Sequence, residues 1–176
     1  MGLADDVPWP VIRGGKKVRG RAMAALSLGA NLGDGRAALA EAAERIGAIA
    51  GVALLRSSCI HITAPLLVEN QPKFFNRCLL IETSLGAEDL LSRLQAIELA
   101  MGRVREERYG PRPIDIDILL FEGPAIATHR LSVPHPQLLR RRFCIEELAD
   151  FKIFLAAEDE AVMEQQLEKI EEGEFF

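Results

Sequence analysis

Residues 102–120, GRVREERYGPRPIDIDILL, decide how this chain folds. Isoleucines alternate with Asp115 and Asp117 over residues 114–118. Because successive side chains of a β-strand point to opposite faces, the isoleucines would face a core while both carboxylates share the other face. The two acids would then lie roughly 7 Å apart at their bases. The pattern predicts a half-buried strand with one acidic face.

Four arginines and a restricted turn come directly before this strand. They are Arg103, Arg105, Arg108 and Arg112. Two acids this close stay ionised at little cost only beside cations, such as magnesium or these guanidinium groups. Prolines on both sides of Arg112 restrict its backbone immediately before the acids. The layout is typical of metal-assisted phosphoryl transfer, although a solvated edge strand can show the same Asp-Ile-Asp pattern.

The remaining segments predict an α+β fold. Apolar stretches at residues 24–29, 52–58 and 74–83 are typical of strands, and residues 34–49 and 87–101 repeat apolar side chains at helical spacing. The second helix is expected to bury one apolar side, made of Leu90, Leu91, Leu94, Ile97 and Leu99. With the acidic strand last, the order βαββαβ is that of a ferredoxin-like antiparallel sheet with helices packed on its face.

Composition favours one domain with a sizeable core, since 49% of the 176 residues are hydrophobic and the net charge is −5. No apolar run is long enough to span a bilayer and no signal-peptide core is present, so we expect no membrane contact and a cytoplasmic location. The acidic balance argues against a nucleic-acid binder. Cys59, Cys78 and Cys144 are an odd number and far apart, which indicates small buried residues rather than disulfides or a zinc site.

Three parts follow from the distribution of charge and apolar residues. Residues 1–21 mix proline, glycine and basic side chains and are expected to be an extension, and residues 22–151 hold the folded domain. Residues 152–176 form an acidic tail with apolar residues at helical spacing, which predicts a helix without a catalytic role.

Further candidates for binding lie outside the acidic strand. Phe74 and Asn76 alternate along one strand, so a ring and an amide share a face suited to a flat heterocycle, although a core phenylalanine beside a turn-capping asparagine gives the same pattern. His135 lies between two prolines, and residues 140–142 are arginines that run directly into Phe143. An arginine and an aromatic ring there could both face a nucleotide pocket.

Five motifs in this order resemble the 6-hydroxymethyl-7,8-dihydropterin pyrophosphokinases of folate biosynthesis. They are LGANLGD at residues 28–34, NQPKFFN at residues 70–76, Glu98 with GRVR at residues 102–105, GPRPIDID at residues 110–117, and PHP at residues 134–136. The resemblance covers residues 24–151 and is most specific in the GPRPIDIDILL block. It implies a ferredoxin-like enzyme that transfers pyrophosphate from ATP to the pterin hydroxymethyl group and releases AMP.

The resemblance also implies a role for individual residues. Asp115 and Asp117 would bind two magnesium ions, and Arg103 and Arg112 would be catalytic. The positions expected to bind ATP are Gln95, Glu98, Arg103, Arg105, Arg112, Ile118, Arg130, Ser132, His135 and Arg141. The positions expected to bind the pterin are Thr63, Ala64, Leu66, Phe74, Asn76 and Phe143. ATP and the pterin would be the partners, with the oligomeric state left open.

Two alternatives come from other functional classes. A non-catalytic binding protein could use the same scaffold, but the presence of both acids and both arginines argues against a decayed site. Ferredoxin-like sheets also carry RNA recognition. That function needs exposed aromatic residues and a basic face, whereas only 6% of this chain is aromatic.

Overall fold

The computed structural model describes residues 20–64, 72–103, 112–138, 142–149, 151 and 168 of the chain. The predicted extension and tail therefore lie almost wholly outside the described residues. The elements are β1 (Ala22–Ala30), α1 (Gly35–Gly47), β2 (Val52–Ser57), β3 (His61–Thr63), β4 (Phe74–Thr83), α2 (Ala87–Ala100), β5 (Asp115–Phe121), β6 (Ile126–Ala127), β7 (Ser132–Val133) and α3 (Arg142–Ala149). None of the helices in these ranges is long and apolar enough to cross a membrane.

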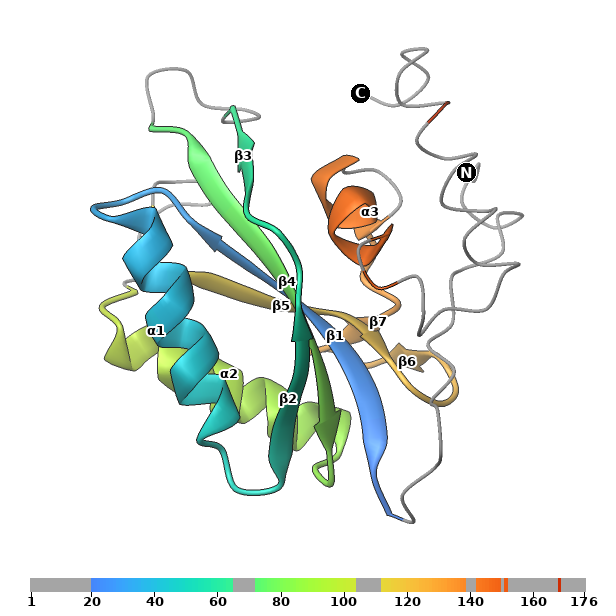
Figure 1. Cartoon of the computed structure of the whole chain (residues 1–176). Helices are drawn as coiled ribbons and strands as arrows, with labels where there is room; N and C mark the ends of the chain where they lie inside the picture. The colour runs from blue at the N-terminus through green and yellow to red at the C-terminus, as the bar shows by residue number, and fades with distance from the viewer. Residues whose placement is uncertain are drawn as a thin grey trace.

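One antiparallel sheet organises the domain (Figure 1), with the strand order β2-β4-β1-β5 and with β3 also paired to β4. The predicted ferredoxin-like fold is confirmed. The strand expected at residues 52–58 continues into β3 after a break, and its pairing with β4 shifts register between Leu54 and Arg56. As the sheet order places β1 in the interior and β5 at an edge, the predicted acidic strand is an edge strand.

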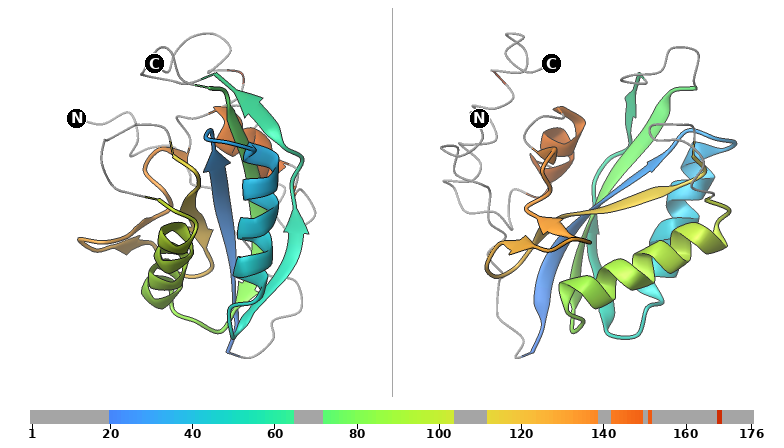
Figure 2. Two further views of the ribbon diagram at one scale, coloured as in Figure 1. Left: turned by 90° about the vertical axis from the view of Figure 1, so that its left-hand side faces the viewer. Right: turned by 180° about the vertical axis from the view of Figure 1, so that it is seen from behind.

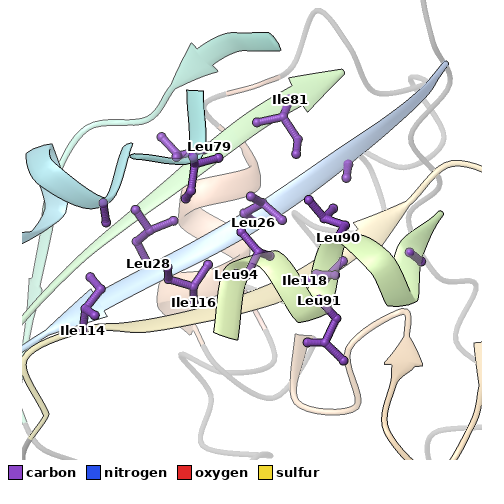
Figure 3. Packing of buried hydrophobic residues seen from close by; sticks show 14 of the residues in the cluster. Leu26, Leu28, Leu79, Ile81, Leu90, Leu91, Leu94, Ile114, Ile116 and Ile118 are labelled. Carbon is purple, nitrogen blue, oxygen red and sulfur yellow. The ribbon is translucent and has the colours of Figure 1, made fainter. Parts of the chain in front are cut away.

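Helices α1 and α2 cover one face of the sheet and enclose the main core, which Figure 3 shows from close by. Ile114, Ile116 and Ile118 are at most 4% exposed, as their alternation with the acids predicts. The prediction for Leu99 is wrong, because its side chain is 73% exposed. Five residues after Leu94 correspond to a rotation of about 140° around the helix axis, so Leu99 leaves the buried side of α2.

The opposite face of the sheet is covered by α3, which the βαββαβ order did not include (Figure 2). A second apolar cluster joins this helix to β1, β4 and β5 through residues such as Met23, Leu80 and Ile145. The hydroxyl of Ser27 also donates a hydrogen bond to Glu147 Oε2 over 3.0 Å, so a buried polar contact helps to dock α3 on β1.

The cysteine prediction holds for two of the three residues. Cys78 and Cys144 are buried in the second apolar cluster, where each behaves as a small apolar side chain. Cys59 is exposed, so the expectation that it is buried is wrong. It lies in the break between β2 and β3, where the alternation of a continuous strand no longer applies.

Candidate active site

The acidic pair lies on the α3 side of β5, opposite the isoleucines. Strand pairing aligns Asp115 with Gly29 of β1, and Gly29 is aligned in turn with Asn76 of β4. Directly opposed residues of antiparallel strands point to the same face, so these three positions form one row across the sheet. Asp117 is aligned with Ser27 in a neighbouring row. The expected metal-binding acids and an expected pterin contact therefore share one face, separated by a glycine.

Two guanidinium groups neutralise the first acid. Arg103 and Arg112 each form an ion pair with Asp115, one to each carboxylate oxygen. Arg103 also contacts the carboxylate of Glu98. The two arginines expected to be catalytic thus meet at one carboxylate, although they approach it from the C-terminal end of α2 and from the turn before β5.

Glu98 joins α2 to the free edge of β5. Its side chain is 4% exposed, and its Oε1 accepts the backbone N–H of Ile116 over 2.7 Å. An edge strand leaves such donors without a strand partner, and this carboxylate supplies one. Burial raises the pKa of Glu98 to about 7, and Asp115 and Asp117 also raise it, while the Ile116 hydrogen bond and Arg103 act in the opposite direction. Glu98, expected only as an ATP contact, therefore also supports the edge of β5.

Replacing Glu98 by glutamine should change how stability depends on pH. The pKa of Glu98 rises from 4.5 to about 7 on folding, so the stabilisation from its protonated form is complete below pH 4.5 and is lost between pH 4.5 and about 7. Glu98→Gln keeps an oxygen for Ile116 and cannot ionise. We expect urea unfolding to show that the variant gains about 3 kcal/mol relative to the parent across this window.

The matched control for that experiment is Glu82→Gln. Glu82 forms an ion pair with Arg21 at the far end of β4, and β1 lies between β4 and β5. It should not reproduce the gain. A difference between Glu98→Gln and the parent that stays constant from pH 4.5 to 8 would contradict the raised pKa.

A pocket runs along the free edge of β5, between α2 and the β6–β7 hairpin, and Figure 2 shows these elements around the strand. Positions expected to bind ATP make up much of its lining. They are Gln95, Glu98, Arg103, Ile118, Arg130, Ser132 and His135. Arg112 is not part of this lining and reaches the site through Asp115. Arg105 and Arg141 lie outside the described residues.

His135 is fixed beside the second acid. Its backbone N–H donates to the carbonyl of Leu119 over 2.9 Å, which occupies another free position on the edge of β5. Its Nδ1 accepts the backbone N–H of Gln137 over 3.2 Å, so the neutral ring carries its proton on Nε2. That nitrogen lies 4.0 Å from Asp117 Oδ2. His135 therefore presents a donor to the pocket next to Asp117.

Arg130 is held by the helix on the other side of the pocket. Its guanidinium donates to Ser92 Oγ over 3.1 Å and lies 3.6 Å from the carboxylate of Glu88. Both partners are on α2, so Arg130 links the β6–β7 hairpin to that helix. The Arg130 side chain is 38% exposed, so its guanidinium can exchange one of these partners for a phosphate oxygen at little cost.

The expected pterin contacts lie across β1 from this pocket. Asn76 is 4% exposed, and its Nδ2 donates to Thr63 Oγ1 over 2.9 Å, so β3 and β4 meet at this amide. Phe74 is half-buried on the same face, and Ala64 is exposed directly after β3. The structure thus brings these four positions together. Leu66 lies outside the described residues, as does the side chain of Phe143.

Gly29 is required by the position of the Asn76 side chain. A Cβ at this residue would lie 3.1 Å from Asn76 Oδ1, tighter than ordinary contact. Gly29→Ala should therefore displace the amide and weaken pterin binding by about 1–3 kcal/mol, as expected for an added methyl group in a packed site. Calorimetry with the pterin alcohol measures this effect. Gly47→Ala, where a Cβ meets nothing within 4 Å, should leave the affinity unchanged.

The two acids fit magnesium that arrives with a polyphosphate. The described residues hold no group of three or more His, Cys, Asp or Glu side chains that could enclose a metal ion. Magnesium is usually held by one or two carboxylates together with phosphate oxygens and water, so such an enclosure is unnecessary. Asp117 has 39% of its side chain exposed, and both acids line the pocket. The donor set is therefore suited to a cation shared with a substrate.

One residue at this site was not identified from the sequence. Asn31 lies within the LGANLGD motif at residues 28–34, but no role was assigned to the asparagine. It is 3% exposed and hydrogen-bonded to the backbone at Arg112. The signal available from the sequence was an asparagine shortly after a predicted strand, but its partner is 81 residues away in the chain.

Known proteins are similar to this chain in sequence. The family described as 7,8-dihydro-6-hydroxymethylpterin-pyrophosphokinase (HPPK) matches residues 25–153. The 2-amino-4-hydroxy-6-hydroxymethyldihydropteridine pyrophosphokinase of Methylorubrum extorquens is 40% identical over 139 residues, which cover 79% of this chain and 88% of that protein. The Bacillus subtilis protein of the same name is 41% identical over 128 residues, covering 73% of this chain and 77% of its own length.

Solved structures share the fold. A crystal structure of HPPK-DHPS in complex with substrates aligns with a TM-score of 0.64 at 16% identity and covers 86% of this chain and 44% of that chain. Plasmodium falciparum HPPK-DHPS with pterin and p-hydroxybenzoate aligns with a TM-score of 0.63 at 14% identity. This chain thus spans less than half of those longer chains, and the likeness at this identity concerns the fold alone.

The matched region begins within β1 and contains the other described strands of the sheet and both acids of the candidate site. The two bacterial relatives are similar over most of their own length as well as most of this chain. The chain therefore belongs to the 7,8-dihydro-6-hydroxymethylpterin-pyrophosphokinase family.

Proposed function

We infer that this chain transfers pyrophosphate from ATP to 6-hydroxymethyl-7,8-dihydropterin in folate biosynthesis, and we propose that it does so on the α3 face of the sheet. The family match supports the reaction. The row of Asn76, Gly29 and Asp115 carries the assignment of the site, because it sets a polar amide and an acid on one face of the sheet with a glycine between them. One substrate would lie at each end of this row.

ATP occupies the pocket beside β5 in this proposal. Leu91 and Leu131 offer apolar contact to a base, and Gln95 and Ser132 offer hydrogen bonds to a base or ribose. Arg130 and His135 add donors for phosphate oxygens, as a guanidinium group and an Nε2–H. By resemblance Arg105 and Arg141 join them. Most residues that line this pocket are polar or charged, which suits the ribose and phosphates of a nucleotide, while the apolar residues suit its base.

The pterin occupies the region of Phe74 and Asn76. A flat heterocycle stacks favourably on an aromatic face, and the Asn76 amide can both donate to and accept from the ring edge. The bond from Asn76 to Thr63 fixes the orientation of that amide. We include Ala64, Leu66 and Phe143 in this site by resemblance.

Two magnesium ions complete the proposed site, held by Asp115 and Asp117 between the two substrates. When bound, they would supply positive charge that offsets the negative charge of the reacting phosphates. The guanidinium groups of Arg103 and Arg112 then exchange Asp115 for phosphate oxygens. Their planar donors can follow negative charge as it develops on the departing AMP.

AMP release on mixing the protein with magnesium, ATP and the pterin alcohol tests the reaction. We expect one AMP and one pterin diphosphate per turnover, and no AMP without magnesium or without the pterin. Formation of ADP would indicate transfer of a single phosphoryl group and contradict the proposal. A non-catalytic binding protein would take up the pterin without releasing AMP.

We assign this activity to residues 22–151, and the cytoplasmic location expected from the sequence stays a prediction. The boundaries rest on the elements that carry the proposed contacts, from β1 to α3. The family match over residues 25–153 supports this assignment.

A further inference from the structure

Asn31 lies at the end of the central strand and bonds in two directions. It follows β1 directly, where that strand has β4 on one side and β5 on the other. Its Oδ1 accepts the backbone N–H of Arg112 over 2.9 Å, and its backbone N–H donates to the Arg112 carbonyl over 3.2 Å. Its Nδ2 donates to the carbonyl of Pro72 over 3.4 Å. One buried side chain thus contacts the segments leading into both neighbouring strands.

The hydrogen bond to Arg112 uses a backbone N–H that lies between two prolines. Pro111 and Pro113 carry no backbone N–H, so Arg112 holds the one backbone donor of residues 111–113. That donor points to Asn31 rather than to a strand partner. Three residues further on, Asp115 forms its ion pair with the Arg112 side chain. The backbone that aims this guanidinium group is therefore fixed by Asn31.

The hydrogen bond to the Pro72 carbonyl fixes the segment that leads into β4. Pro72 lies two residues before Phe74, the first residue of β4, and Asn76 follows in the same strand. The carbonyl held by Asn31 is thus close to the proposed pterin contacts. An asparagine is the shortest side chain that offers an acceptor and a donor in one rigid plane. Aspartate offers acceptors alone, and leucine offers neither.

We propose that Asn31 is a positioning residue for pyrophosphoryl transfer, which acts by holding the backbone of Arg112 toward the acidic pair. Its second bond holds the segment before β4 at the same point, so the phosphate side and the pterin side of the site share one support. This inference rests on the proposed role of Arg112. Asn31 itself touches neither substrate in this assignment.

The test is a double-mutant cycle on kcat with Asn31→Leu and Arg112→Ala. Asn31→Leu keeps the branch point of the side chain and removes the hydrogen bonds to Arg112 and Pro72. We expect it to lower kcat by about 10- to 100-fold, with a smaller change in KM for ATP, because a misplaced catalytic group costs rate more than binding. In the Arg112→Ala background the same substitution should lower kcat by less than about threefold, since its target is gone.

Thr83→Val is the control for a purely structural effect. Thr83 is fully buried, and its Oγ1 accepts the backbone N–H of Leu85 over 3.0 Å at the far end of β4. This variant should lower the unfolding temperature and leave kcat unchanged. A folded Asn31→Leu protein with the kcat of the parent overturns the proposal. The proposal is also overturned if the fold-losses in kcat caused by Asn31→Leu and by Arg112→Ala multiply in the double variant.

Two further variants separate the remaining outcomes. Asn31→Asp keeps the acceptor for Arg112 and should retain a higher kcat than Asn31→Leu. An equal loss of kcat in both variants would assign the effect to the bond with Pro72 and would overturn the proposal that Asn31 acts through Arg112. Should Asn31→Leu not fold, Asn31→Ser, whose shorter side chain reaches neither partner in place, passes through the same cycle. If Arg112→Ala alone keeps full kcat, the proposed function of Arg112 fails, which is distinct from a failure at Asn31.

Discussion

Asp115→Ala and Asp117→Ala should each nearly abolish AMP formation while leaving the protein folded. Each substitution removes a proposed magnesium ligand from the α3 face of β5, whereas the core-facing isoleucines of that strand stay in place. The barrier rises because the phosphates lose both the cation and its placement. Steady-state AMP release at saturating magnesium measures the loss, and thermal unfolding confirms the fold.

Glu82→Ala is the matched control for the acids. It removes another carboxylate of the same sheet, which pairs with Arg21 over 3.1 Å at the opposite end of β4. Its kcat should stay close to that of the parent. Substantial turnover by Asp115→Ala or Asp117→Ala at high magnesium would rule out the assignment of two metal ions to these side chains.

Arg103→Ala and Arg112→Ala should lower kcat by on the order of 100-fold or more, comparable to the loss of a donor aimed at developing charge. The affinity for ATP should change less, because other groups lining the pocket remain. Single-turnover measurements separate the chemical step from binding. Equal losses in binding without a loss in kcat would assign the arginines a purely positional role.

The two arginine variants should differ in stability. Arg103 contacts the buried carboxylate of Glu98, whereas Arg112 contacts the more exposed carboxylate of Asp115. Loss of Arg103 leaves Glu98 with less compensation for its burial. Arg103→Ala should therefore unfold at a lower temperature than Arg112→Ala. Arg45→Ala, which breaks an exposed pair with Glu41, is the control and should alter neither kcat nor stability appreciably.

Local patterns in the sequence were sufficient to predict an antiparallel sheet and the acidic face of β5. Alternation at residues 114–118 indicated which side chains are buried, because a strand repeats every two residues regardless of its neighbours. The helix at α2 was also predicted, but Leu99 was placed on the wrong side. Proteins tolerate single exposed leucines, and the residue type alone does not distinguish such a leucine from one in the core.

Contacts between distant segments could not be predicted in the same way. Glu98 reaches the edge of β5, and Ser27 bonds to Glu147 across 120 residues of chain. Both contacts depend on how α2 and α3 dock, which no local period encodes. The resemblance to a family identified Glu98 as a position of interest, but the hydrogen bond to Ile116 and the raised pKa became visible only in three dimensions.

The row that aligns Asn76, Gly29 and Asp115 also fixes the distance between the pterin side and the phosphate side of the proposed site. Adjacent strands lie about 4.8 Å apart, so the backbones of Asn76 and Asp115 are held about 10 Å apart by hydrogen bonds along β1. Neither loop closure nor side-chain rotation can alter that spacing without breaking the sheet. A substrate analogue with one extra carbon in its alcohol arm would carry its oxygen up to about 1.5 Å past the position of the natural hydroxyl. The sheet would therefore discriminate by arm length in the rate of transfer, even where the heterocycle binds equally well.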